Sequence, residues 1–161
     1  MLVEEDGISP HIFNAVVIPH GIDNLVNRQH RITSLHKLAQ ESGLWDELVE
    51  VVERTYNISK GIKVDGEVKE ELLKEEPEKA LWDAYENNED KIKALIKEEK
   101  YAQASKLYHQ VFAKPAHLFF EKVFVNVEDL PLRNNRILLN QKISRLYTDH
   151  IADLSRIPRK K

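Results

Sequence analysis

The sequence predicts an all-α protein, a helical bundle of roughly six to eight helices that forms a single domain over residues 1–161. Apolar spacing is the first observation, because every apolar pattern longer than about eight residues repeats with the period of a helix. Length is the second, since 161 residues are enough to bury one core. The third is the absence of cysteine, which means that packing alone must hold the fold.

The N-terminal part of the chain predicts two helices. Ser9-Pro10 combines an N-cap residue with a proline at the first helical position, so a short helix should begin there and end at Pro19-His20-Gly21. A second helix should begin at a cap formed by Asp23 or Asn24 and run to about Ser42.

Two arginines of the second helix lie on or beside its apolar stripe. We interpret Arg28 and Arg31 as partly buried side chains held by carboxylates. Direct binding of RNA by the same two arginines is the alternative.

A third helix should run from Leu44 to about Lys60 and bury an apolar stripe. Arg54 and Asn57 lie about 60° apart on the side away from that stripe. A solvated face with a Glu50–Arg54 pair of the i, i+4 type is one interpretation. Contact of Arg54 and Asn57 with phosphate or with an unpaired base is the other.

The middle of the chain is charged. From Val64 to Glu76 the sequence breaks at Gly66, which predicts a turn and a short acidic helix. Glu75-Glu76-Pro77-Glu78 should open the next helix, because proline and acids suit a first helical turn. We expect the acids of that helix to form a solvated face.

Three further helices are expected in the C-terminal part. A helix over residues 101–114 should end at Pro115, and another apolar helix should start at this proline and run through Val123. The longest pattern, Leu130 to Ile157, predicts a final helix that buries one face along its whole length. Pro131 suits the first turn of that helix.

The formal net charge is −3, but the charges are unevenly distributed. Residues 65–100 hold 13 acidic and 7 basic side chains, whereas residues 133–161 hold 8 basic and 2 acidic ones. A chain with this distribution can bind RNA on one face if the acidic segment points away from the phosphates.

No motif in the sequence points to catalysis. The chain has five glycines without a glycine-rich phosphate loop, and none of its seven histidines are spaced to share a metal, so we predict no catalytic residue and no metal site. His150, on the stripe of the final helix, is predicted to be a packed core histidine. No run approaches the roughly 18 apolar residues of a membrane span. We therefore expect a cytoplasmic protein with no membrane partner.

Three segments of the chain resemble, in the same order, the end of the bacterial glycyl-tRNA synthetase beta subunit, which is its DALR-type anticodon-binding domain. The segments are Glu53–Ile58, Pro115–Val125, and Glu128–Leu139 with Ile151–Ser155. The first is similar to K-R-x-x-N-I and the second to P-x-D-A-F-F-D-x-V-M-V, with His117 where the family usually has an acid. In the third, Pro131 interrupts D-A-L-R. The resemblance implies a helical bundle of the DALR type and a chain that is the C-terminal fragment of a longer beta subunit.

The resemblance also implies a function. The expected role is recognition of tRNA(Gly) at its anticodon region, in support of ATP-dependent charging with glycine by an alpha-beta ligase. The expected partners are the alpha subunit and the remainder of the beta subunit. ATP and magnesium would bind to the full enzyme, and this fragment would hold no cofactor. The alternative is a helical protein–protein interaction or structural module with no RNA role.

These considerations assign roles to individual basic and amide side chains. The side chains predicted to bind RNA are Arg54, Asn57, Lys60, Lys142, Arg145 and Arg156. Arg133 and Arg136 lie near or on the stripe of the final helix, and we predict that both are tied to carboxylates inside the domain.

Overall fold

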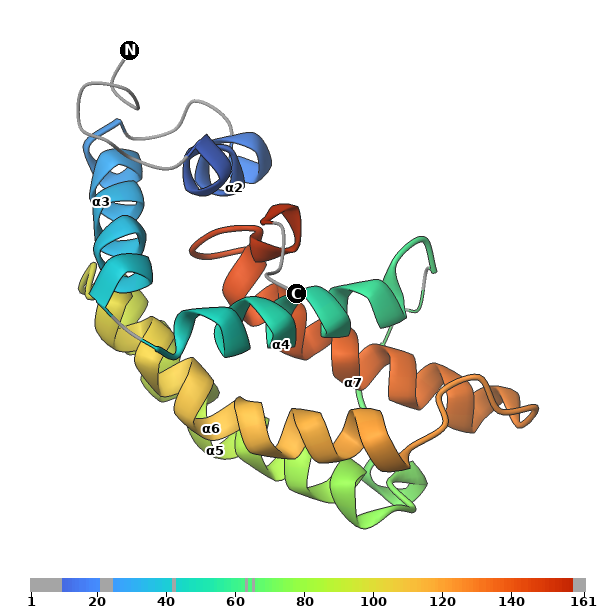
Figure 1. Cartoon of the computed structure of the whole chain (residues 1–161). Coiled ribbons are helices and arrows are strands. Elements are labelled where there is room, and N and C mark those ends of the chain that lie inside the picture. Colours follow the sequence, from blue (N-terminus) through green and yellow to red (C-terminus); the bar gives the residue numbers. More distant parts are fainter. Residues whose placement is uncertain (1–9, 21–24, 42, 63, 65, 158–161) are drawn as a thin grey trace.

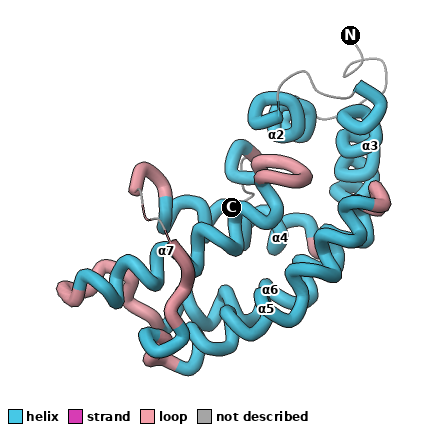
Figure 2. The backbone as a smooth tube through the Cα atoms, turned by 180° about the vertical axis from the view of Figure 1, so that it is seen from behind, coloured by secondary structure: helices cyan, strands magenta, loops and turns pink. Residues whose placement is uncertain are grey.

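The computed structural model describes residues 10–20, 25–41, 43–62, 64 and 66–157. In this part of the chain every secondary-structure element is a helix (Figure 1), and Figure 2 shows loops as the only other structure. The elements are α2 (Pro10–His20), α3 (Leu25–Glu41), α4 (Trp45–Ser59), η1 (Glu70–Leu72), α5 (Glu76–Lys97), α6 (Tyr101–Lys122), α7 (Leu130–Thr148) and η2 (Leu154–Arg156), where η marks a 3-10 helix. The predicted all-α fold is confirmed. The predicted caps Asp23 and Asn24 lie outside the described residues.

Two helix pairs packed on each other form the body of the bundle (Figure 1). A short turn joins α5 to α6, and these two helices lie side by side along most of their length. α4 packs against α7 and also contacts α6. α2 and α3 pack against each other at one end of the bundle, where α2 contacts η2 and α3 contacts α6.

Aromatic side chains of α6 and α7 fill the centre of the core. The largest fully buried aromatic residues are Tyr108, Phe112, Phe119 and Tyr147. The Tyr108 hydroxyl donates to the carbonyl oxygen of Ile143 at 2.7 Å, and the Tyr147 hydroxyl lies 2.7 Å from Ser105 Oγ. A buried polar group without a partner costs about 1–3 kcal/mol, so these bonds allow the two tyrosines to pack as core residues.

α6 does not end at Pro115, as the sequence predicted, but continues through it as one helix of 22 residues. A proline inside a helix removes one backbone hydrogen bond and costs about 3 kcal/mol. The apolar stripe of α6 continues across the proline, because Phe112, Ala116 and Phe119 are all 0% exposed. Burial of this stripe against the other helices outweighs the cost, and one helix replaces the two predicted ones.

α7 ends at Thr148, well before the predicted end at Ile157. The chain then turns, and Ile151 is fully buried in that turn. The amide of Asp153 donates to the carbonyl oxygen of Ala15 in α2 at 2.8 Å. Tertiary contacts with the N-terminal helices therefore stabilise this turn more than continuation of α7 would.

Two side chains near this turn were singled out in the sequence. Arg31 of α3 is buried, and its Nη1 donates to the carbonyl oxygen of Ile151 at 3.0 Å. His150 is exposed, whereas a packed core histidine was predicted. The reason is the end of α7 at Thr148, because His150 no longer lies on the buried stripe of a helix.

A buried ion pair joins α5 to α7. Arg136 Nε lies 2.6 Å from Glu78 Oε1, and the side chains are 5% and 0% exposed. Glu78 Oε2 also accepts the backbone amides of Lys74 at 2.9 Å and Glu75 at 2.8 Å. The expectation that all acids of α5 are solvated is thus wrong at Glu78, whose position in the first helical turn places it over these free amides.

Arg136 and Arg133 differ, although both were predicted to be tied to carboxylates. Arg136 Nη1 additionally donates to the carbonyl oxygen of Phe124 in the α6–α7 loop. Arg133 is half-buried, and its predicted tie to a carboxylate is not found among the described residues. The one fully buried carboxylate at this junction, Glu78, is already occupied by Arg136 and by two backbone amides.

Replacing Arg136 by alanine should lower the free energy of unfolding by about 3–5 kcal/mol, because Glu78 would keep a buried charge without its partner. Urea denaturation followed by far-UV circular dichroism measures this loss. Arg145→Ala, from an exposed position of the same helix, is the control and should change stability by less than about 0.5 kcal/mol. Equal transition midpoints for Arg136→Ala and the wild type would contradict the role of the ion pair.

Candidate nucleic-acid interface

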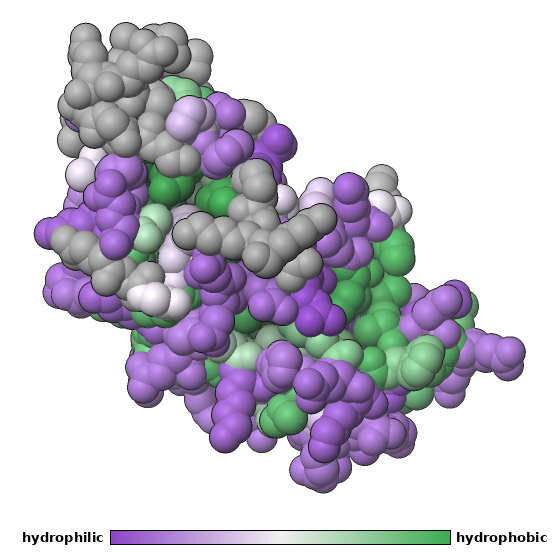
Figure 3. Space-filling view, in the orientation of Figure 1, coloured by the Kyte–Doolittle hydropathy of each residue, from purple (hydrophilic) through white to green (hydrophobic). Residues whose placement is uncertain are grey.

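A groove runs along the C-terminal half of α7, where this helix faces the end of α4 and the middle of α5. Two adjoining hollows of about 410 Å³ and 350 Å³ form it, and they share Gln141, Arg145 and Asp149. Figure 3 shows hydrophobic side chains beside the C-terminal end of α4, with a mostly hydrophilic surface around them. We call this feature the α7 groove; its other main lining residues are Tyr56, Lys60, Tyr85, Glu89, Lys93 and Lys142.

The spacing of residues on α7 explains what this helix contributes. Gln141, Arg145 and Asp149 follow one another at intervals of four residues, so they share one side of the helix. With its amide oriented to satisfy both ends, Gln141 donates to the carbonyl oxygen of Val64 at 3.3 Å and accepts from Arg145 Nη2 at 3.1 Å. The guanidinium of Arg145 is thus held at the groove while its side chain stays exposed.

Among the described residues that line the α7 groove, basic groups outnumber acidic groups. The cations are Lys60, Lys93, Lys142 and Arg145, and the carboxylates are Glu89 and Asp149. A local excess of positive charge is what an RNA phosphate requires, even in a chain with a net charge of −3.

The negative charge of Glu89 is compensated by neighbouring side chains of the groove. Its Oε2 accepts from the Tyr85 hydroxyl at 2.7 Å and from Lys93 Nζ at 2.9 Å. Burial raises the pKa of the Glu89 carboxyl, but these two hydrogen bonds and the charges of Lys93 and Lys142 outweigh burial and hold the pKa below its usual value. The acidic segment was expected to point away from the basic surface, but α5 forms one wall of the groove. The Glu89 carboxylate of α5 is paired there with Lys93.

The structure brings together three of the six side chains predicted to bind RNA. Lys60 and Arg145 line one hollow of the α7 groove, and Lys142 and Arg145 line the other. Lys60 is exposed at the C-cap of α4, and Lys142 is half-buried on α7. Whether these side chains bind RNA stays a prediction.

The other three lie outside the described lining of the groove. Arg54 turns toward α6, where its Cζ lies 4.2 Å from the centroid of the Phe120 ring, and its Nη1 lies 3.4 Å from Glu50 Oε1. Arg156 pairs with Asp153, with 3.2 Å between Nε and Oδ2. Asn57 is exposed on α4.

Sequence reasoning missed the contribution of α5 to the groove. Neither Tyr85 nor Lys93 of this helix was predicted to line a binding site. The i, i+4 spacing of Glu89 and Lys93 was the available signal, because it predicts a pair on one helix face. The register of α5 against α7, which brings that pair to Lys142, is a tertiary feature with no local signal.

No group of three or more His, Cys, Asp or Glu side chains in the described part of the chain is placed to hold a metal ion. None of its helices is both long and apolar enough to cross a membrane.

The described residues form an all-α bundle with a groove along α7 to which several basic side chains contribute. The chain belongs to the family described as the DALR anticodon binding domain, whose family model matches residues 48–149. The match covers most of α4 and all of α5, α6 and α7, the helices that line the α7 groove.

Proteins of known name are similar along most of the chain. The glycine–tRNA ligase beta subunit of Halothermothrix orenii is 30% identical over 147 residues, which are 90% of this chain and 21% of that protein. The beta subunit of Myxococcus xanthus is 32% identical over 145 residues, 88% of this chain and 20% of that protein. Glycine–tRNA ligase, chloroplastic/mitochondrial 2 of Arabidopsis thaliana is 28% identical over 159 residues, 98% of this chain and 14% of that protein.

These matches confirm the resemblance to the glycyl-tRNA synthetase beta subunit and its anticodon-binding domain. The chain spans about a fifth of the length of the bacterial relatives.

The packing of Arg54 on Phe120 can be measured by a double-mutant cycle. Arg54→Ala should lower the free energy of unfolding by roughly 0.5–1 kcal/mol, because an exposed cation–π contact has about that strength. In a Phe120→Leu background the same substitution should cost less, and the difference is the coupling energy. An identical cost in both backgrounds, measured by chemical denaturation, would show that the ring does not hold the guanidinium.

Proposed function

We propose that this domain binds the anticodon region of tRNA(Gly) through the α7 groove, as part of a glycine–tRNA ligase beta subunit. The observation that carries the proposal is the convergence of Lys60, Lys142 and Arg145, from two helices, on one groove. The matched family and the similar beta subunits support anticodon recognition as the use of such a groove.

The chemistry of the groove suits a single-stranded loop. An anticodon loop exposes phosphates and unpaired bases together, and proteins read such loops with cations and with side chains that stack on or bond to bases. The ammonium and guanidinium groups would hold the backbone. Tyr56, half-buried in the wall beside Lys60, offers an aromatic surface next to these cations.

The proposed setting is the alpha-beta enzyme of the cytoplasm. There the alpha subunit and the remainder of the beta subunit would complete the ligase, and ATP and magnesium would bind outside this domain. The groove would position the tRNA, and the chemistry of glycine activation would take place elsewhere.

A protein-interaction role is the second candidate, and one observation favours it. Phe124 is 79% exposed in the α6–α7 loop. Large exposed apolar side chains often contact a partner protein. This surface would dock the remainder of a beta subunit, a role that is compatible with tRNA binding in the groove.

RNA binding by the domain should weaken as salt increases. If Lys60, Lys142 and Arg145 each neutralise one phosphate, the logarithm of the binding constant should fall with the logarithm of salt concentration with a slope of about −2. Fluorescence anisotropy of a labelled anticodon stem–loop at several salt concentrations measures the slope. Binding that does not change between low and physiological salt would contradict the proposed contacts.

Arg145→Ala should weaken binding of the same stem–loop and make the slope of the salt dependence shallower by about 0.7, because one phosphate contact is lost. Arg156→Ala is the matched control, since that arginine is 44% exposed and lies outside the described lining of the groove. Equal binding by wild type and Arg145→Ala, or a larger loss with Arg156→Ala, would place the RNA on another face.

The isolated domain should not activate glycine. Its sequence lacks a glycine-rich phosphate-binding loop, which is a common way to hold ATP. ATP–pyrophosphate exchange should stay at background with or without glycine. Glycine-dependent exchange by the purified domain would mean that it contains an active site of its own.

A further inference from the structure

A third hollow extends the α7 groove toward the N-terminal end of α7. It has a volume of about 390 Å³ and shares Val64 and Leu138 with the adjoining part of the groove. Its walls combine the apolar residues Leu72, Leu130, Pro131 and Leu138 with the charged residues Glu67 and Lys69. The two parts adjoin along α7: Lys142 and Arg145 line one part, and Leu130 and Pro131 line the other, which we call the apolar end.

Asn134 projects into this apolar end. The residue is half-buried, and no side chain or backbone group in the described part of the chain forms a hydrogen bond with its amide. The neighbouring Asn135 is different, because its Oδ1 accepts the amide of Lys69 at 2.7 Å and its Nδ2 donates to the carbonyl oxygen of Lys69 at 3.1 Å. Asn135 fixes the opposite wall to α7, and Asn134 keeps a donor and an acceptor available.

The combination matches the shape and polarity of a nucleobase. A base has two apolar faces and a polar edge that carries donors and acceptors side by side. Leu130 and Pro131 are exposed and provide an apolar surface next to the Asn134 amide. A side-chain amide can form two hydrogen bonds with a base edge, and it can do so with an unpaired base of an RNA loop.

We propose that the apolar end of the groove receives one unpaired base of the RNA loop, with Asn134 hydrogen-bonding to the edge of that base and Leu130 and Pro131 contacting its face. The inference rests on the proposed function and adds a base-reading subsite to the phosphate-binding part. Phosphates bind near Arg145 and Lys142, and the chain of the RNA continues along α7 to this subsite.

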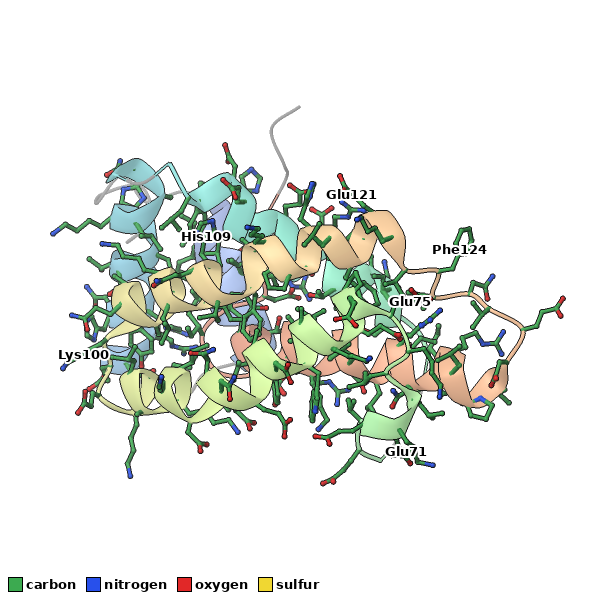
Figure 4. The ribbon with its side chains drawn as sticks, turned by 90° about the horizontal axis from the view of Figure 1, so that it is seen from below. Glu71, Glu75, Lys100, His109, Glu121 and Phe124 are labelled. Carbon is green, nitrogen blue, oxygen red and sulfur yellow. The ribbon has the colours of Figure 1, made fainter. Side chains whose placement is uncertain are left out.

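Continuity with the basic part favours RNA over a protein in this hollow. In the view of Figure 4, Glu71 of η1, which borders this end of the groove, lies on one side of α7, and Phe124 lies on the other. The most exposed aromatic ring is therefore not part of the subsite. A protein partner has that separate apolar surface to contact, whereas the groove joins an apolar end to cations.

The test compares RNAs that lack single bases. Binding of an anticodon stem–loop of glycine tRNA is measured by anisotropy, together with a series in which one loop position at a time is abasic. Asn134→Ala should weaken the intact stem–loop roughly tenfold. One abasic RNA should bind the wild type with a similar loss of affinity, and Asn134→Ala should not weaken the binding of that RNA further. Asn126→Ala, from an exposed residue of the α6–α7 loop, is the matched control and should bind like the wild type.

A second variant distinguishes loss of RNA binding from loss of folding. Asn134→Leu keeps the approximate size of the side chain and removes its donors and acceptor without adding a charge, so it should also weaken binding of the intact stem–loop, at an unchanged melting temperature. If wild-type binding is salt-dependent and Arg145→Ala weakens it, but neither Asn134 variant does, the subsite is overturned and the proposed function stands. The subsite is also overturned if Asn134→Ala weakens the binding of every abasic RNA as much as that of the intact stem–loop. A contact of Asn134 with the RNA backbone would then explain the losses. If the wild type binds no stem–loop, the proposed function itself fails.

Discussion

The ion pair between Glu78 and Arg136 is the constraint on which the rest of the arrangement depends. Glu78 is fully buried at the start of α5, and its carboxylate accepts from two backbone amides as well as from Arg136. Arg136 also holds the α6–α7 loop through the carbonyl oxygen of Phe124. One carboxylate therefore fixes α5, α7 and the loop before α7 against one another. Breaking such a pair is costly because the remaining charge cannot reach water.

The position of the α7 groove follows from this junction. Lys142 lies six residues after Arg136, about 9 Å along the helix at 1.5 Å per residue. A fixed register at Arg136 therefore sets where Lys142 and Arg145 stand relative to Glu89 and Lys93 of α5. Two interactions with Glu89 follow: the charge of Lys142 acts on its carboxylate, and Lys93 Nζ bonds to it at 2.9 Å.

Local signals in the sequence predicted the helices well, and tertiary contacts explain the errors. Most helix positions followed from spacing and from prolines at first turns, such as Pro131. Pro115 was taken as a stop, but burial of one stripe on both sides of it exceeded its local cost. Glu78 was taken as a solvated acid, since its partner lies 58 residues away along the chain. The site was predicted in part: Lys142 and Arg145 share a helix, whereas the packing of Arg54 on Phe120 depends on α6.

A map of RNA-induced amide shifts tests the assignment of the binding face most directly. The isotope-labelled domain is titrated with an anticodon stem–loop of glycine tRNA, and amide resonances are followed by NMR. Shifts should concentrate on Lys60, on residues 141–145 and on Asn134, while α2 and α3 stay unchanged. Shifts confined to the opposite surface of the bundle, around His117 and Phe120 of α6, would contradict the assignment of the α7 groove as the RNA-binding face.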